Sequence, residues 1–148
     1  MSLFEVSAES SELVVRSPTS PTTYVRFFDW SRVDDHEIAF GVECVADGMH
    51  ARLDSVSLSV WDRAGDLTEF LDGLAKDFRG WKEDRSWVTS RLALTAAFHS
   101  GGHVQLSWLL RRGTFAEDAW ECSVTTTLEA GEQMSKLASD VRSFLHQG

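Results

Sequence analysis

The dipeptide Asp47-Gly48 constrains the fold of this chain more than any other feature, because it separates two segments in which apolar residues alternate. Asp-Gly is typical of a two-residue hairpin turn, and such a turn determines which residues of the flanking strands are paired. The predicted pairs are Ala46 with Met49, Val45 with His50, Cys44 with Ala51, Glu43 with Arg52 and Val42 with Leu53. In this register the apolar side chains share one face, so the turn and the alternation predict the same hairpin.

The alternation changes phase after Leu53, and a β-bulge near Asp54-Ser55 would account for the change. A second hairpin is predicted with a three-residue turn at 100–102. Its pairs are Phe98 with Val104, Ala96 with Leu106, Leu94 with Trp108 and Leu92 with Leu110. A two-residue turn would place these side chains on opposite faces, so we prefer the longer turn. A third alternating strand at 120–126 is expected to join this hairpin.

Two other segments carry apolar residues at the three- and four-residue spacing of amphipathic helices, at about residues 67–79 and 129–146. Asp66 is expected to cap the first helix, and Gly80 is expected to end it. Two early strands precede the Asp-Gly hairpin, so the order is four strands, a helix, three strands and a helix. This order predicts one α+β domain over residues 1–148, with an antiparallel sheet of about seven strands and two main helices packed on one face.

The charge balance excludes several classes of partner. The chain has 148 residues, with 14 Lys and Arg against 23 Asp and Glu, and its formal net charge is −9. Nucleic acids and anionic membrane surfaces attract basic proteins, so neither is expected as a partner. Another protein, in particular a basic one, fits this charge better. No segment approaches the roughly 20 apolar residues that span a bilayer, and the N-terminus lacks a signal-peptide pattern, so the expected location is the cytoplasm.

The common sequence patterns of catalysis are absent. The patterns G-x-S-x-G, G-x-x-x-x-G-K-[ST], H-E-x-x-H and G-x-G-x-x-G do not occur. Cys44 and Cys122 fall at core-facing positions and imply no disulfide framework. We therefore expect a protein that is not an enzyme, with no cofactor and no catalytic or metal-binding residues. His99 and His103 are predicted to face each other beside the second turn; either they share a metal with further ligands that the sequence does not place, or they are polar surface.

The segment 77–87 is the most unusual part of the chain, because tryptophans and basic residues are interleaved in it. In one interpretation, Trp81 and Trp87 form an aromatic wall while Arg79 and Arg85 bind an anion. In the other interpretation, the tryptophans cover the end of the first helix and the arginines pair with neighbouring acidic residues.

Two further charge patterns leave alternatives open. Arg91 and Arg111 are opposed in the register of the second hairpin, where like charges repel each other. Acidic side chains from a neighbouring strand would compensate this repulsion, and so would an anionic ligand or the acidic surface of a partner. The acidic groups at 34–37 and 117–118 are either a contact surface for a basic partner or ordinary solvated loops.

One set of motifs spans the C-terminal part of the chain: D-F-R-G-W at 77–81 followed by Trp87, G-H-V at 102–104, Trp120, and E-A-G-E at 129–132. Together they cover about the last 80 residues and resemble an uncharacterised family of small bacterial proteins. More loosely, an acidic single domain of strands and helices is similar to immunity proteins of bacterial toxin systems, in architecture and charge and without a shared motif. Neither likeness assigns a role to a residue.

These observations lead to a preferred function and two others. The preferred one is a non-enzymatic cytoplasmic module that binds another protein, as an immunity protein or inhibitor does. The alternative is a small-molecule or anion-binding protein that uses the Trp/Arg cluster after the first helix: Arg79, Trp81, Arg85, Trp87, Arg91 and Arg111. The third is a homodimer that pairs through an exposed edge strand, at 14–15 or at 24–28.

Overall fold

The computed structural model describes residues 4–7, 12–59, 66–113 and 119–147. In chain order their elements are β1 (Phe4–Ser7), β2 (Glu12–Ser17), β3 (Ser20–Arg32), β4 (Glu37–Ala46), β5 (Met49–Ser59), α1 (Leu67–Lys76), β6 (Arg85–Val88), β7 (Leu92–His99), β8 (His103–Arg111), β9 (Glu121–Glu129) and α2 (Glu132–Leu145). The α+β class with antiparallel pairing and two main helices is confirmed. The acidic pair at 117–118 lies outside the described residues.

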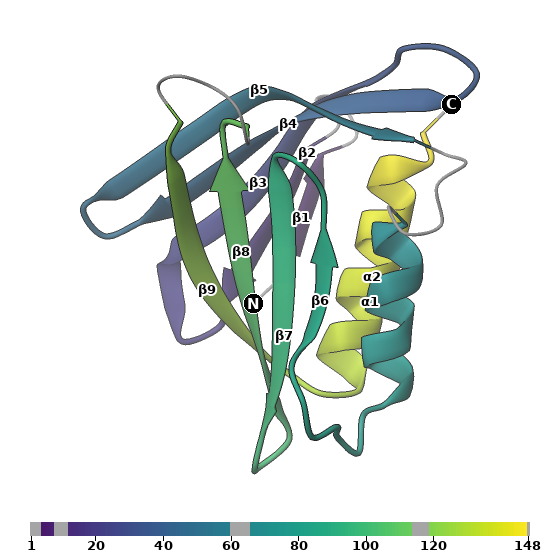
Figure 1. The fold of residues 1–148 in the computed structure, drawn as a ribbon. Coiled ribbons are helices and arrows are strands. Elements are labelled where there is room, and N and C mark those ends of the chain that lie inside the picture. The colour runs from purple at the N-terminus through teal and green to yellow at the C-terminus, as the bar shows by residue number, and fades with distance from the viewer. Residues whose placement is uncertain (1–3, 8–11, 60–65, 114–118, 148) are drawn as a thin grey trace.

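The strands form two antiparallel sheets, so the prediction of one sheet of about seven strands is wrong. The first sheet has five strands, β1 to β5, and the second has four, β6 to β9, each in sequential order. The sheets face each other with β9 against β2 and β3, while α1 and α2 lie side by side along one side of both sheets (Figure 1). The boundary between the two sheets falls at α1 in the chain. Each strand pairs with its neighbour in sequence, and α1 lies between β5 and β6.

Both predicted hairpin registers are confirmed. Around Asp47-Gly48, β4 and β5 pair as predicted from Ala46 with Met49 to Val42 with Leu53. Around the second turn, β7 and β8 pair as predicted, and His99 faces His103. The expected third strand is β9, which pairs with β8.

Two β-bulges bend the five-stranded sheet at the level of Gly41. In β5, Asp54 and Ser55 together oppose Gly41, which confirms the predicted bulge. In β3, a second register shift falls between Phe28 and Ser31, where Asp29 has a φ of 51°. This shift moves Trp30 to the inner face, where its Nε1 donates to the carbonyl oxygen of Leu145 at the end of α2. Bulges increase the local twist of a strand, so the pair curls the sheet around the core.

The two helices are shorter than the sequence predicts. At the start of α1, the Asp66 side chain accepts a hydrogen bond from Glu69 N, as expected for a cap. The helix ends at Lys76, because Asp77 leaves helical geometry and Gly80, with a φ of 118°, turns the chain toward β6. Residue Glu129 belongs to β9, whose hydrogen bonding continues through Ala130 N to Gly102 O, so α2 begins only after Gly131.

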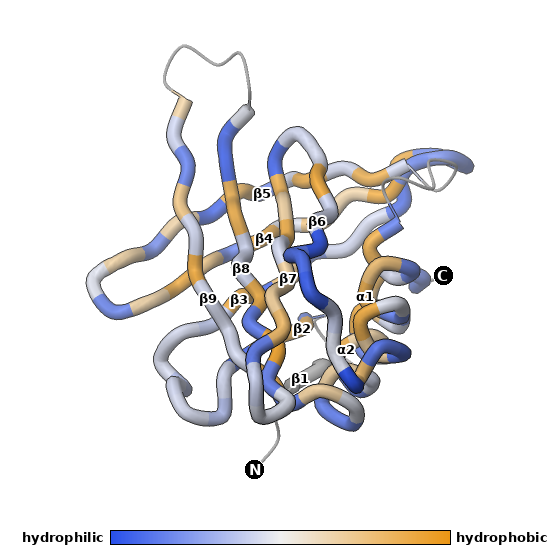
Figure 2. Tube along the Cα trace, turned by 60° about the horizontal axis from the view of Figure 1, so that its bottom comes forward, coloured by the Kyte–Doolittle hydropathy of each residue, from blue (hydrophilic) through white to orange (hydrophobic). Residues whose placement is uncertain are grey.

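One apolar core lies between the two sheets and the helices. Apolar residues recur along the strands and on the inner stripes of both helices, whereas the turns are mainly hydrophilic (Figure 2). At its centre the ring of Phe27 lies 5.3 Å from Phe40, 5.9 Å from Trp108 and 5.8 Å from Phe144, measured between ring centroids. These rings come from both sheets and α2, so one aromatic cluster joins the layers.

The predicted edge strands are interior strands. Residues 14–15 lie in β2, between β1 and β3, and residues 24–28 lie in β3, between β2 and β4. The prediction that either segment is an exposed edge strand is therefore wrong, because the backbone groups of both segments are already paired within the sheet. Neither helix within the described ranges combines the length and the apolar character that crossing a bilayer requires.

Candidate functional site

The Trp/Arg cluster predicted after the first helix is divided between two places. Trp81 packs edge-on against Phe98, with ring centroids 5.2 Å apart, and its Nε1 donates to the Ala96 carbonyl oxygen at 3.3 Å. The guanidinium carbon of Arg85 lies 4.8 Å from the Trp81 ring centroid, and its Nη1 donates to Asp77 at 2.6 Å. The Arg85–Asp77 pair fits the interpretation in which the arginines pair with neighbouring acidic residues, whereas the ring packing and the hydrogen bond of Trp81 are with β7 rather than with the end of the first helix.

Trp87 and Arg79, the other two residues of the predicted cluster in this segment, lie in different surroundings. Trp87 belongs to the core at 4% exposure, and its Nε1 has no hydrogen-bond partner among the described residues. Arg79 is exposed and lies over the ring of its neighbour Phe78 at 5.6 Å. The two tryptophans and two arginines therefore do not converge on one surface.

Arg91 and Arg111 lie at the other end of β7, beside the turn between β6 and β7. The opposition of these residues is confirmed by the bond from Arg111 N to Arg91 O. Their guanidinium groups donate to backbone carbonyl oxygens, which was not among the expected alternatives. An acidic residue on a neighbouring strand was expected, and Glu121 of β9 is the strand partner of Arg111. Arg91 Nη1 donates to Ser55 O at 3.0 Å, and Arg111 donates to Ser90 O and Thr89 O at 2.9 and 3.0 Å.

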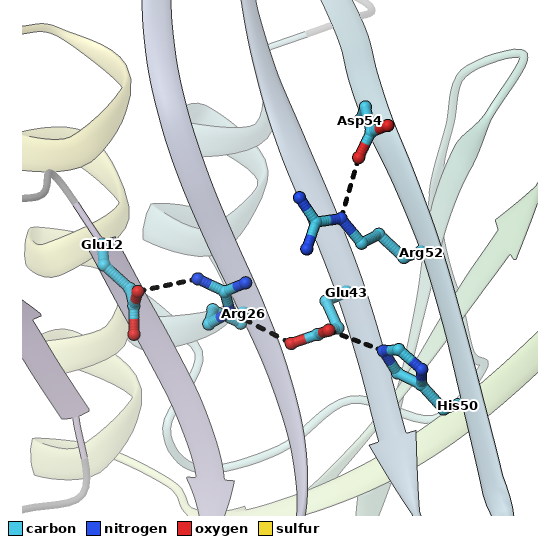
Figure 3. A network of polar contacts seen from close by, with 6 residues as sticks. All are labelled: Glu12, Arg26, Glu43, His50, Arg52 and Asp54. Carbon is cyan, nitrogen blue, oxygen red and sulfur yellow. Dashed lines mark hydrogen bonds and ion pairs between the residues drawn. The ribbon is translucent and has the colours of Figure 1, made fainter.

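The outer face of the five-stranded sheet carries a polar network that runs across four strands (Figure 3). Arg26 donates to Glu12 at 2.7 Å and to Glu43 at 3.0 Å, and His50 Nε2 lies 2.6 Å from Glu43. Arg52 is the strand partner of Glu43, as predicted, but its Nε donates to Asp54 at 2.8 Å. The network links β2, β3, β4 and β5 through side chains as well as through the backbone.

An aromatic ring is held within this network. The guanidinium carbons of Arg26 and Arg52 lie 4.3 and 4.5 Å from the centroid of Phe28. The ring lies on Gly41, where an added Cβ would come within 2.3 Å of it. Sequence reasoning missed this feature, although two signals were present: Phe28 follows the core-facing Phe27 directly, and glycine inside a strand often marks a close approach.

The network changes the ionisation of its two central groups. Burial alone would raise the pKa of Glu43, but the hydrogen bonds and charges of His50 and Arg26 lower it overall. Burial alone would lower the pKa of Arg26, but its bonds to Glu43 and Glu12 raise it overall. The folded protein therefore favours the charged form of each group more than the unfolded chain does, and this difference stabilises the fold at neutral pH, where both groups are ionised.

Replacing Glu43 by glutamine is expected to lower the free energy of unfolding by about 1–3 kcal/mol at pH 7, because Arg26 loses a charged partner. A carboxylate with a lowered pKa stabilises the fold above its unfolded pKa of 4.5, and this contribution disappears as pH falls through the folded value. The difference in free energy of unfolding between the wild type and the variant, measured by urea titration, should therefore become smaller below about pH 4.5. Asp54→Asn, at an 83% exposed side chain, is the control and should change stability by less than about 0.5 kcal/mol at either pH. A deficit that persists in acid would contradict this role of Glu43.

The turn between β3 and β4 projects past the end of α2 (Figure 1). Its backbone is held by bonds from Val33 N and Asp34 N to Glu37 O, at 2.9 and 3.3 Å, and His36 N donates to Asp34 Oδ1 at 2.7 Å. Val33 is 54% exposed, and Asp34 and Asp35 are exposed beside it. An apolar side chain thus lies next to two carboxylates on an ordered turn.

The remaining predicted residues lie apart from these features. His99 Nε2 is 2.8 Å from Gln105 Oε1, and no group of three or more His, Cys, Asp and Glu is placed to hold a metal within the described ranges. Cys44 and Cys122 are free thiols. Burial, with smaller effects of Cys122 and Glu43, raises the pKa of Cys44 to about 12, so this thiol is protonated at neutral pH.

A model of a protein family, described as Family of unknown function (DUF6228), matches residues 16–148. The expected likeness to an uncharacterised family is confirmed to this extent, and the match reaches well beyond the C-terminal part that carried the resemblance. No curated protein and no solved structure matches the chain.

Proposed function

The chain belongs to DUF6228, a family of unknown function, and we propose that it is a non-enzymatic module that binds another protein through the turn between β3 and β4. An immunity or inhibitor role, with a partner that carries a basic patch, is the most concrete form of this proposal. The proposal places the protein in the cytoplasm, a reducing compartment in which the free thiols of Cys44 and Cys122 remain reduced.

The observation that carries the proposal is the exposed Val33 beside Asp34 and Asp35 on an ordered, projecting turn. A partner gains apolar contact from the valine and electrostatic complementarity from the carboxylates. Because three hydrogen bonds already hold the turn, binding would lose little conformational entropy there. The net charge of −9 supports the choice of a basic partner, since it attracts such a protein over a distance.

The test is a pull-down from native lysate with the tagged protein at about 0.1 M and about 1 M salt, between which the Debye length falls from about 10 Å to about 3 Å. We expect one protein to be retained at the lower salt concentration and lost at the higher one. The variant with Asp34→Asn and Asp35→Asn should bind that protein about tenfold more weakly, because two exposed ion pairs contribute roughly 1–2 kcal/mol. Asparagine at position 34 keeps the oxygen that accepts from His36 N.

The matched control is Asp47→Asn, at the opposite end of β4. Asp47 is also an exposed turn residue, and Asn-Gly forms this turn as well as Asp-Gly does. It removes one acidic charge without touching the β3–β4 turn, so binding should stay within about twofold of the wild type. Equal binding by the wild type and the doubly substituted variant, or retention of no protein at low salt, would overturn the proposal.

A further inference from the structure

A polar pocket of about 420 Å³ lies where the bulge of β5 meets the turn between β6 and β7. It is lined by Ser55, Val56, Ser57, Thr89, Ser90 and Arg91. Five of these six residues have polar side chains, and none of the six is acidic. Pockets for small molecules typically measure about 300–1,000 Å³, so this one can hold a ligand larger than a single ion.

Arg91 is held in place at the rim of this pocket. Its Nη1 donates to Ser55 O at 3.0 Å, which ties the guanidinium to the bulged segment of β5. A guanidinium has five N–H donors, and this bond uses one of them. A tethered arginine loses less conformational entropy when it binds an anion than a freely rotating one would.

Arg111 removes the groups that would repel an anion from the turn. Carbonyl oxygens carry partial negative charge, and those of Thr89 and Ser90 both accept hydrogen bonds from the Arg111 guanidinium. The Ser55 carbonyl oxygen is likewise occupied by Arg91. The pocket therefore presents serine and threonine hydroxyl groups and the positive charge of Arg91. Arg111 does not line the pocket, but it holds two carbonyl oxygens of the turn that does.

We propose that this pocket binds the phosphate group of a small phosphorylated metabolite. The hydroxyl-bearing residues lie on two sides, with Ser55 and Ser57 on β5 and Ser90 on the turn, so donors from two directions can surround a tetrahedral oxyanion. Arginine matches phosphate with parallel N–H···O bonds, and these charge-assisted bonds are about twice as strong as neutral ones.

The pocket is independent of the proposed protein contact, because none of its lining residues belongs to the turn between β3 and β4. A variant that loses phosphate binding can therefore still be tested for protein binding, and the reverse also holds. The sequence predicts Arg91 and Arg111 in one cluster with Trp81 and Arg85, but of these four residues only Arg91 lines the pocket.

The test is a titration of the full chain with inorganic phosphate, followed by amide chemical shifts at constant ionic strength, with chloride as the reference anion. Saturable shifts are expected at residues 55–57 and 89–91. Arg91→Ala should weaken phosphate binding at least about tenfold, since it removes charge-assisted hydrogen bonds. Arg91→Lys should give an intermediate affinity, because lysine keeps the charge and loses the planar fork.

Two further variants separate binding from folding. Arg79→Ala removes an exposed arginine that stacks on Phe78, away from the pocket, and should leave phosphate binding unchanged. Ser57→Ala removes a lining hydroxyl from an exposed position and should weaken binding while the melting temperature stays that of the wild type. Shifts that do not saturate, shifts equal to those with chloride, or binding by Arg91→Ala as strong as that of the wild type would overturn the proposal.

Discussion

Replacing Phe27 by alanine is expected to lower the free energy of unfolding by about 3–5 kcal/mol. The side chain is completely buried, and its ring packs against Phe40 of β4, Trp108 of β8 and Phe144 of α2. The substitution removes a large apolar group and leaves a cavity at the point where both sheets and α2 meet. Since a domain typically has only about 5–15 kcal/mol of stability, the loss is a large fraction of the total.

Chemical denaturation followed by tryptophan fluorescence and by circular dichroism measures this effect. The two signals should shift together, because the core is shared by both sheets. Phe78→Ala provides the matched control: this phenylalanine is 52% exposed, and its loss should change stability by less than about 0.5 kcal/mol. A loss below about 1 kcal/mol for Phe27→Ala would mean that the two sheets do not depend on one aromatic cluster.

The second large effect is expected at Gly41, where alanine should destabilise the protein by about 2–3 kcal/mol. An added Cβ would lie 2.3, 2.4 and 2.8 Å from three atoms of the Phe28 ring. The ring cannot move away easily, because Arg26 and Arg52 stack on it. The clash therefore has to be relieved by breaking the stack or by bending β4.

Alanine in place of Gly73 in α1 should instead stabilise the protein. No atom lies within 4 Å of a Cβ built there, and alanine is favoured over glycine in a helix by about 0.5–1 kcal/mol. In a Phe28→Ala background, Gly41→Ala should cost less than about 1 kcal/mol, since the clashing ring is gone. Equal costs of Gly41→Ala with and without Phe28 would show that the ring is not what excludes a side chain at this position.

Much of the local structure could be predicted because its causes are local. The Asp47-Gly48 turn and the alternation beside it determine the register of β4 and β5, and a shift of one residue would turn every apolar side chain outward. The phase change after Leu53 located the bulge for the same reason. In β3 a similar change of phase, from Phe27 to Trp30, marks the second bulge, but it was not among the predictions.

The candidate site was predicted less well, because its contacts join residues that are distant in sequence. The opposition of Arg91 and Arg111 follows from the hairpin register, but the carbonyl oxygen of Ser55 that anchors Arg91 comes from the other sheet. Trp81 and Arg85 were placed in the same cluster because they are close in sequence. Arg85 begins the extended strand β6, and Arg91 lies beyond the other end of this strand.

By itself, then, the sequence determined the class of the fold, the two hairpins, the bulge in β5 and the capped start of α1. All of these depend on side-chain periodicity and turn chemistry within short segments. Only the tertiary structure decided that the strands divide into two facing sheets, that Phe28 rests on Gly41 between two arginines, and that Arg91 lies on a pocket. Each of these depends on which surfaces meet when the apolar faces of separate hairpins and helices are buried together, and periodicity within one segment does not specify its partner.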